Sequence, residues 1–228
     1  MNSTPQNLQV LHEDNHLIII NKRPGDIVQG DKTGDTPLNE VVKEYIKIKY
    51  NKPGNVYLGV VHRLDRPTSG IVVFAKTSKA LPRLNNLFKE KEVKKIYWAL
   101  VKNPPPKQKD TLTHFMVRNT KKNKSYAHLK EVPESKKAIL SYKIIKELNS
   151  YYLLEIQLES GRHHQIRSQL SAIGSPIKGD LKYGFDRSNK DGSLHLHSRE
   201  ISFIHPVKHS EIHVIAPPPD DVLWNNCL

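Results

Sequence analysis

Cysteine is nearly absent from this sequence: the only one, Cys227, stands next to the end of the 228 residues. An intramolecular disulfide is therefore impossible, and a metal site built on cysteine is disfavoured. Long apolar runs are also missing. The longest one near the N-terminus, residues 17–20, is far shorter than the roughly 20 residues that span a bilayer, and too short for the core of a signal peptide. We therefore expect a cytoplasmic protein without a membrane segment.

Signatures of bound cofactors are missing as well. The sequence contains neither the GxxxxGK[ST] pattern of a phosphate-binding loop nor the HExxH spacing of a zinc helix. His163 and His164 are adjacent, but side chains at neighbouring helix positions point in different directions. We expect no metal and no organic cofactor.

Acidic residues are few compared with basic ones. The chain has 36 Lys and Arg against 23 Asp and Glu, which gives a net charge of +13. Such a surplus attracts polyanions and speeds the encounter with them. The charge alone does not distinguish RNA from DNA or anionic lipid, and a lysine-rich surface also serves solubility.

The pattern of apolar residues predicts many short strands and few helices. Residues 10–21 indicate a strand, a turn and a strand, and Asn149-Ser150 is typical of a hairpin turn between strands at 139–148 and 151–158. Helices are expected after Thr36, at about 78–89 and at 161–173. We predict an α+β fold formed by one domain over residues 1–228, with a mainly antiparallel mixed sheet, flanking helices and a loose segment at 1–7.

The most informative stretch is the turn at residues 61–70, where Asp65 lies among His62, Arg63 and Arg66. Nearby cations favour the ionised form of a carboxylate. An ionised Asp can act as a nucleophile or as a general base. The alternative is that Asp65 only caps the turn or pairs with one of the two arginines.

A second stretch, residues 161–170, has Arg162, Gln165 and Gln169 at helical spacings of three and four. On a helix these side chains form a row of amide and guanidinium donors suited to phosphates and base edges. An ordinary polar helix face explains the same pattern.

One further feature points to RNA. Tyr97 follows two lysines on a predicted strand, a combination that can stack a base and hold a phosphate. A core aromatic residue on a buried strand is the alternative. Lys178 lies in a tightly turned loop over residues 174–184.

Together these stretches closely resemble the RluA-type pseudouridine synthases, from about Val10 to Ile215. The matching segments are His62 to Asp65 with Thr68 to Gly70, Lys95 to Tyr97, Gly161-Arg162 with His164 to Arg167, Gly174 to Gly184, and His195 to His197 with Phe203 and His205-Pro206. His163 and Gln169 depart from the common family residues, which are Thr and His. Nothing at the start of the chain resembles the additional RNA-binding module of some relatives.

The resemblance implies an RNA-modifying isomerase that needs no cofactor, because the reaction breaks the bond between uracil N1 and ribose C1′, turns the base, and joins its C5 to C1′. It implies Asp65 as the catalytic aspartate, Tyr97 as the aromatic residue on the target base, and Arg167 as the basic partner of Asp65. His62, Arg63, Arg66, Arg162, Gln165 and Lys178 are expected to contact RNA. The partners would be stem-loops of ribosomal or transfer RNA, with the target base flipped out of its helix.

Two alternatives stay open from the sequence. One is a basic RNA-binding protein without catalytic activity, although Asp65, Tyr97 and Arg167 are all present. The other is a hydrolase of glycosides or nucleobases, which usually needs a second acidic residue as proton donor. Asp180 is the candidate for that role. The oligomeric state is not readable from the sequence.

Overall fold

The computed structural model describes residues 2–31 and 33–228. Internal contacts divide the chain into two compact units. The first unit comprises Met1–Lys94 and Ser198–Pro219, and the second comprises Lys95–His197 and Asp220–Leu228. The grouping into one domain stays a prediction.

The first unit is built on antiparallel strands that carry the segment around Asp65. In order across the sheet they are β1 (Val10–Glu13), β2 (Leu17–Lys22), β4 (Ser69–Ala75) and β10 (Leu196–Ile204), with β3 (Gly59–Val60) paired to β4 and β11 (Glu211–Ile215) paired to β10. The pairs β1–β2, β2–β4, β3–β4 and β10–β11 are antiparallel. Its two helices are α1 (Leu38–Lys49) and α2 (Ala80–Lys89).

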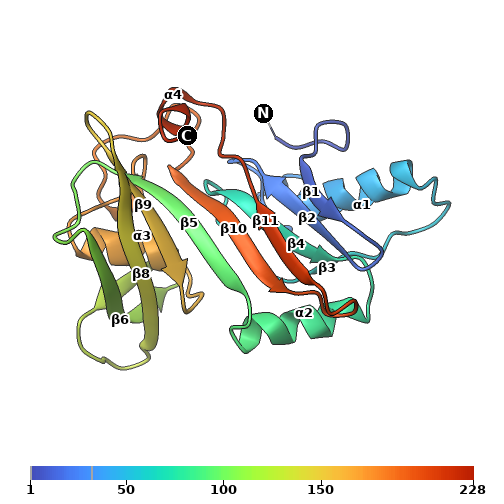
Figure 1. Ribbon diagram of the computed structural model, residues 1–228, viewed down its shortest axis with the longest axis horizontal. Helices are drawn as coiled ribbons and strands as arrows, with labels where there is room; N and C mark the ends of the chain where they lie inside the picture. The colour runs from blue at the N-terminus through green and yellow to red at the C-terminus, as the bar shows by residue number, and fades with distance from the viewer. Residues whose placement is uncertain (1, 32) are drawn as a thin grey trace. The chain divides into compact units, whose positions relative to one another are not determined.

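The helices α1 and α2 cover opposite faces of this sheet, and both can be followed in Figure 1. Ile18 and Ile20 of β2 pack with α1, whereas Leu17 and Ile19 pack with α2. Successive side chains of a strand point to opposite faces. A strand covered on both faces therefore needs a continuous apolar run instead of alternation, which explains residues 17–20.

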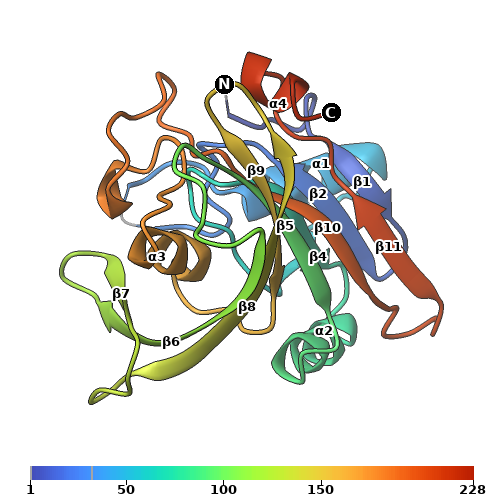
Figure 2. The ribbon, with the colours of Figure 1, turned by 60° about the vertical axis from the view of Figure 1, so that its left-hand side comes forward.

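The second unit carries five strands and the segment around Arg167. In order they are β5 (Lys94–Val101), β9 (Tyr152–Leu158), β8 (Lys136–Glu147), β6 (Lys109–Asn119) and β7 (Lys124–His128), all antiparallel to their neighbours. Helix α3 (Gln165–Ala172) lies beside the β6–β7 hairpin (Figure 2). The 3-10 helix η1 (Leu181–Tyr183) and helix α4 (Val222–Asn225) complete the unit.

The α+β class with mainly antiparallel strands is confirmed, and so is the hairpin at Asn149-Ser150. The prediction of a loose segment at 1–7 is wrong at Ser3, because this residue is buried. Its backbone N–H and its hydroxyl group both donate to the Asp26 carboxylate, at 2.9 and 2.6 Å. In the described part of the chain, no helix combines the length and the apolarity needed to cross a bilayer.

Candidate active site

Asp65 lies in the first unit, in a turn between β3 and β4. The turn is closed by the Thr68 N–H, which donates to the Asp65 carbonyl at 3.0 Å. The Asp65 side chain is half-buried, whereas Arg63 and Arg66 are exposed. Arg66 forms an ion pair with Asp35. Asp65 therefore lies in a turn that also carries two exposed arginines, one of which is paired with Asp35; its catalytic role stays a prediction.

A buried lysine lies beneath this turn. Lys22 is only 1% exposed, and its Nζ donates to the backbone carbonyls of Arg23 and Arg66, at 2.9 and 3.1 Å. Burial lowers the pKa of Lys22 to about 7, and the charges of Asp26 and Asp65 oppose that shift. Lys22 therefore supports the Asp65 turn from below. The sequence offers one signal for this role, since Lys22 stands only two positions after the apolar run at 17–20.

His62 has a structural environment in the same unit. Its Nε2 accepts the backbone N–H of Val73 at 3.0 Å. Its ring stacks on Phe88, with centroids 4.7 Å apart and planes 23° apart. The side chain thus fixes the start of the Asp65 segment to β4 and α2, while its expected contact with RNA stays a prediction.

Gly70 fixes the other end of the segment. Its φ of +108° is a conformation that side chains disfavour, and an added Cβ would lie 2.3 Å from the Ser198 carbonyl oxygen. The close approach of these two backbones therefore requires glycine here. The requirement explains the Thr68-Ser69-Gly70 part of the motif in physical terms.

Arg167 lies in the second unit and is 5% exposed. Its Nε and Nη2 donate to Oδ2 and Oδ1 of Asp180 at 2.7 and 2.9 Å, a two-point ion pair. The guanidinium carbon lies 5.1 Å from the centre of the Tyr183 ring. Such paired, charge-assisted bonds hold the guanidinium in one orientation. Asp180 was expected only as a candidate proton donor, and its role in orienting Arg167 was missed.

The predicted row of donors on one helix face is wrong. Helix α3 begins at Gln165, because His164 adopts a left-handed conformation with φ of 52°. Gln165 and Gln169 are buried, at 3% and 0% exposure. The Gln165 side chain binds Ser160, the Arg162 N–H and the Ile139 carbonyl. Of the three residues only Arg162 is exposed, and Gln165 braces the loop from within.

Tyr97 and Lys178 also belong to the second unit. Tyr97 lies on β5 opposite Ile156 of β9 and is 7% exposed. The Lys178 ammonium donates to Oδ1 of Asn189 at 2.6 Å, and burial lowers its pKa. The structure thus groups Arg167 with Asp180 and Tyr183, and Asp65 with Lys22. That Asp65 and Arg167 act on each other stays a prediction.

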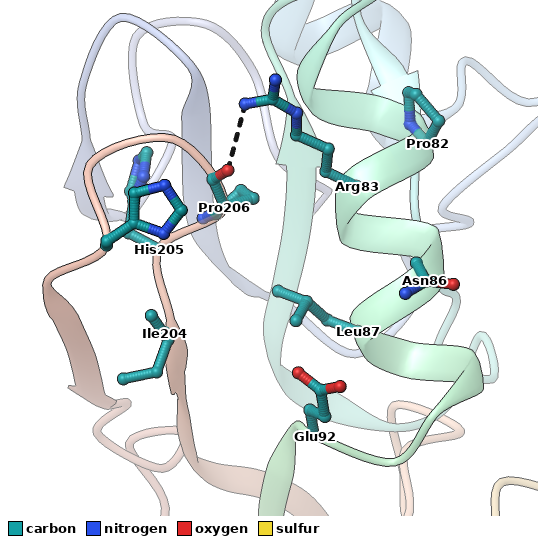
Figure 3. A pocket seen from close by; sticks show the side chains of 9 residues that line it. Pro82, Arg83, Asn86, Leu87, Glu92, Ile204, His205 and Pro206 are labelled. Atoms are coloured by element: carbon teal, nitrogen blue, oxygen red, sulfur yellow. Dashed lines mark hydrogen bonds between the residues drawn. The ribbon is translucent and has the colours of Figure 1, made fainter.

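A groove of about 510 Å³ lies elsewhere in the first unit, between α2 and the turn that joins β10 to β11 (Figure 3). Arg83 reaches across it and donates to the Pro206 carbonyl at 3.2 Å. None of the predicted site residues lines this groove. Among the described residues there is also no group of three or more His, Cys, Asp or Glu that could hold a metal ion.

The fold is one that solved pseudouridylate synthase structures share. The human RNA pseudouridylate synthase domain containing 4 matches 95% of this chain and 90% of its own, with a TM-score of 0.80 and 24% identity. The human RNA pseudouridylate synthase domain containing 1 matches all of this chain and 90% of its own, with a TM-score of 0.75 and 21% identity. At these identities the similarity concerns the fold.

The sequence defines the family. The model of the RNA pseudouridylate synthase family matches residues 16–172, which include Asp65, Tyr97 and Arg167. The chain therefore belongs to the RNA pseudouridylate synthase family. The predicted family and the predicted enzyme class, an isomerase, are confirmed.

Named relatives are 30–35% identical. An uncharacterised RNA pseudouridine synthase of Synechocystis is 33% identical over 216 residues, covering 93% of this chain and 66% of the relative. The ribosomal large subunit pseudouridine synthase C of Buchnera aphidicola from Acyrthosiphon pisum is 35% identical, and the match covers 92% of this chain and 67% of the relative. The ribosomal large subunit pseudouridine synthase D of Zymomonas mobilis is 30% identical, and the match covers 94% of this chain and 70% of the relative. The chain spans about two thirds of the length of these relatives.

Proposed function

We propose that this protein converts specific uridines of structured RNA to pseudouridine, with Asp65 as the catalytic residue. The observation that carries the proposal is a half-buried carboxylate in a backbone-braced turn, inside the segment that matches the family model. The net charge of +13 suits a polyanionic substrate.

Asp65 would act as a nucleophile or as a base on the target nucleoside. Tyr97 would pack on the uracil ring, and Arg167, held by Asp180, would present a fixed positive charge to the Asp65 carboxylate. An opposite charge nearby keeps a carboxylate ionised, which both of its possible roles require.

The substrate is proposed to be a stem-loop of ribosomal or transfer RNA. Two of the named relatives are ribosomal large subunit pseudouridine synthases, which favours ribosomal RNA. A uridine inside an RNA helix is out of reach for an enzyme that acts on its glycosidic bond, so the target would be flipped out or already looped. The exposed Arg63 and Arg66 of the first unit would contact the RNA backbone, with His62 holding their segment in place. Arg162 and Lys178 of the second unit would contact it as well.

The hydrolase alternative has lost its support. A hydrolase of this kind needs an acid that donates a proton to the leaving group. Both oxygens of Asp180 already accept hydrogen bonds from the Arg167 guanidinium, and the side chain is 1% exposed. Asp180 is therefore placed to orient a cation and not to protonate a substrate.

The test is the substitution Asp65→Asn, which keeps the size of the side chain but removes both nucleophile and base. We expect pseudouridine formation in RNA from a deletion strain to fall by at least a factor of about 10⁴, in line with losses at residues that act directly in catalysis. Binding of the same RNA should change little.

The matched control is Glu40→Gln, which removes one negative charge from an exposed position on α1. It should retain wild-type turnover. Near-normal turnover of Asp65→Asn would remove Asp65 from the mechanism, and absence of pseudouridine with the wild-type protein would remove the proposed activity itself.

A further inference from the structure

The loop that follows β2, residues 23–28, holds the Asp65 turn through a shared backbone carbonyl. The Gly25 N–H donates to the Arg66 carbonyl at 2.9 Å, and the Lys22 ammonium donates to the same carbonyl at 3.1 Å. Two donors from the end of β2 and its loop thus converge on the residue that directly follows Asp65. A shift of this loop would therefore move the Asp65 carboxylate as well.

A buried carboxylate, Asp26, lies in the same loop and is 6% exposed. Its Oδ1 accepts the Ser3 N–H at 2.9 Å, and its Oδ2 accepts the Ser3 hydroxyl at 2.6 Å. An ionised carboxylate is costly to bury unless its oxygens accept hydrogen bonds. Ser3, itself buried, meets this need on both oxygens and thereby fixes the orientation of the carboxylate.

The segment around Ser3, residues 2–7, contacts the loop at further points, and we call this segment the strap. The Arg23 guanidinium donates through Nη2 to the Asn7 carbonyl at 3.1 Å. A Cβ added to Gly25 would lie only 3.3 Å from Oδ1 of Asn2. The strap therefore lies against the loop on both sides of Ser3, and the catalytic proposal uses none of its residues.

Asp26 also acts electrostatically on the buried Lys22. Burial lowers the pKa of Lys22 to about 7, whereas the negative charges of Asp26 and Asp65 raise this pKa and the positive charge of Arg66 lowers it. Of the two carboxylates, Asp26 has the larger effect. A carboxylate near a buried ammonium favours its protonated form, so Asp26 helps Lys22 to remain a cation beneath the Asp65 turn.

We infer that the strap is a positioning element of the catalytic site: Ser3 holds the Asp26 carboxylate in place, and Asp26 holds Lys22 as the cation that supports the Asp65 turn. Ser3 and Asp26 are positioning residues, because they act through Lys22 and the loop and supply no group to the substrate. This inference rests on the proposed function, since it takes Asp65 to be the catalytic residue.

The scheme predicts which kinetic step depends on the strap. Without the Ser3 hydroxyl, Asp26 loses a charge-assisted hydrogen bond and its fixed orientation. The loop then holds the Arg66 carbonyl less firmly, and Asp65 is displaced from the reacting atoms. The RNA contacts are not affected, so the rate on bound RNA should fall while the affinity for RNA stays the same.

The first measurement is the saturating single-turnover rate and the dissociation constant on one stem-loop RNA. The rate should fall about tenfold for Ser3→Ala and on the order of 100-fold for Asp26→Asn, at an unchanged dissociation constant. Ser3→Thr, which keeps both donors, should retain the wild-type rate. In the Asp26→Asn background, Ser3→Ala should have little further effect, because the two residues act through one contact.

The matched controls are Thr33→Ala and Asp31→Asn. The Thr33 N–H and hydroxyl both donate to Oδ1 of Asp31, so the chemistry is the same as in the strap, but this pair is exposed. Both control variants should keep the wild-type rate. Ser3→Ala removes one hydrogen bond only, so it decides the question even if Asp26→Asn does not fold.

The second measurement tests the charge of Lys22 and needs no RNA. Urea unfolding with and without Lys22→Met, between pH 5 and pH 9, gives the contribution of Lys22 to the free energy of unfolding. With Asp26 present this contribution should begin to rise at about pH 7. In the Asp26→Asn background Lys22 loses its proton more readily, so the rise should begin about one pH unit lower. The Asp31→Asn background should leave the onset unchanged.

The inference is overturned if Ser3→Ala turns over RNA like Thr33→Ala, or if it weakens RNA binding and leaves the saturating rate unchanged. An onset of the pH dependence that is the same with and without the Asp26 charge also overturns it. Failure of the proposed function looks different: the wild-type protein would then form no pseudouridine, while the unfolding measurements would still report the coupling of Asp26 to Lys22.

Discussion

Arg167 and Asp180 form a buried ion pair in the second unit. The guanidinium is 5% and the carboxylate is 1% exposed, and two hydrogen bonds join them. A buried ion pair adds little net stability compared with apolar residues, but the loss of one partner leaves an uncompensated buried charge. The pair therefore fixes the position of Arg167 more than it stabilises the fold.

We expect Asp180→Asn to lower the free energy of unfolding by about 3–5 kcal/mol, and turnover to fall with it because Arg167 is no longer held in place. Urea unfolding and single-turnover kinetics measure the two effects. The matched control is Asp186→Asn, since Asp186 pairs with Lys102 at 3.5 Å on the surface of the same unit. Its cost should stay below about 1 kcal/mol, and an equal cost for both variants would contradict the argument.

Lys22 gives a second prediction at this scale, for the dependence of stability on pH. Burial lowers its pKa from 10.5 to about 7. Between these values the unfolded chain holds a proton that the folded chain has released, so the free energy of unfolding rises with pH over this window. Below about pH 7 Lys22 is charged in both states, and the free energy of unfolding is at its lowest with respect to this group.

The measurement compares wild type with Lys22→Met by urea unfolding at pH 7, 8 and 9. As the pH rises, the free energy of unfolding of the wild type should increase relative to that of Lys22→Met, by up to about 1.4 kcal/mol per pH unit. Other lysines titrate in both proteins and cancel in the comparison. A difference that stays constant, or that falls with pH, would show that Lys22 is not the buried group we describe.

At the scale of elements, the segment between β3 and β4 is defined by where two backbones meet. A Cβ at Gly70 would lie 2.3 Å from the Ser198 carbonyl oxygen and 2.6 Å from the Ser198 nitrogen. These are backbone atoms of β10, so no side chain can move aside to make room. The positive φ of Gly70 adds a conformational cost.

We therefore expect Gly70→Ala to destabilise the protein by at least about 3 kcal/mol, from the clash and the backbone strain together. The control is Gly34→Ala, since Gly34 also has a positive φ, of +78°, but no atom within 4 Å of an added Cβ. That variant should cost only about 1 kcal/mol. Thermal unfolding of the two variants separates the clash from the strain, and equal melting temperatures would refute the close approach.

Elements with strong local signals were predictable from the sequence. The continuous apolar run at 17–20 indicated a strand, and Asn149-Ser150 indicated a hairpin turn. Strands β6 and β7 were missed, because Lys109 to Asn119 and Lys124 to His128 alternate with many polar residues and lie half-exposed. Helix α4 was missed as well, although Asp221 caps it by accepting from the backbone N–H of Leu223 and of Trp224.

The site shows the same division between local and distant information. Asp65 and Arg167 stand in motifs that can be read along the chain. The Arg167–Asp180 pair and the position of Lys22 beneath the Asp65 turn arise from contacts between segments far apart in sequence, which no periodicity reports. The start of α3 was misplaced because the left-handed conformation of His164 depends on its contacts with Tyr183 and His163.

At the scale of the whole molecule, the reaction itself sets what the protein must supply. Converting uridine to pseudouridine breaks one bond of the base and forms another, with no change in redox state and no group lost. The side chains that we propose for this task are a carboxylate, a guanidinium and a phenol. The only cysteine, Cys227, is buried among apolar residues, and burial raises its pKa to about 11, which disfavours the thiolate that binds metals.

We therefore expect full activity without added metal or nucleotide. The purified protein should convert a short stem-loop RNA in excess EDTA at a rate within about twofold of the rate without chelator, a difference below 0.5 kcal/mol in activation free energy at ~1.4 kcal/mol per tenfold. A short stem-loop is needed because magnesium folds larger RNAs, and chelation would then remove the substrate instead of inhibiting the enzyme. A control RNA melting curve in the same buffer shows that the stem persists. If EDTA abolishes turnover on a folded stem-loop and one specific metal restores it, then the carboxylate, guanidinium and phenol are not sufficient, and the proposed mechanism needs a metal ion bound by residues other than these three.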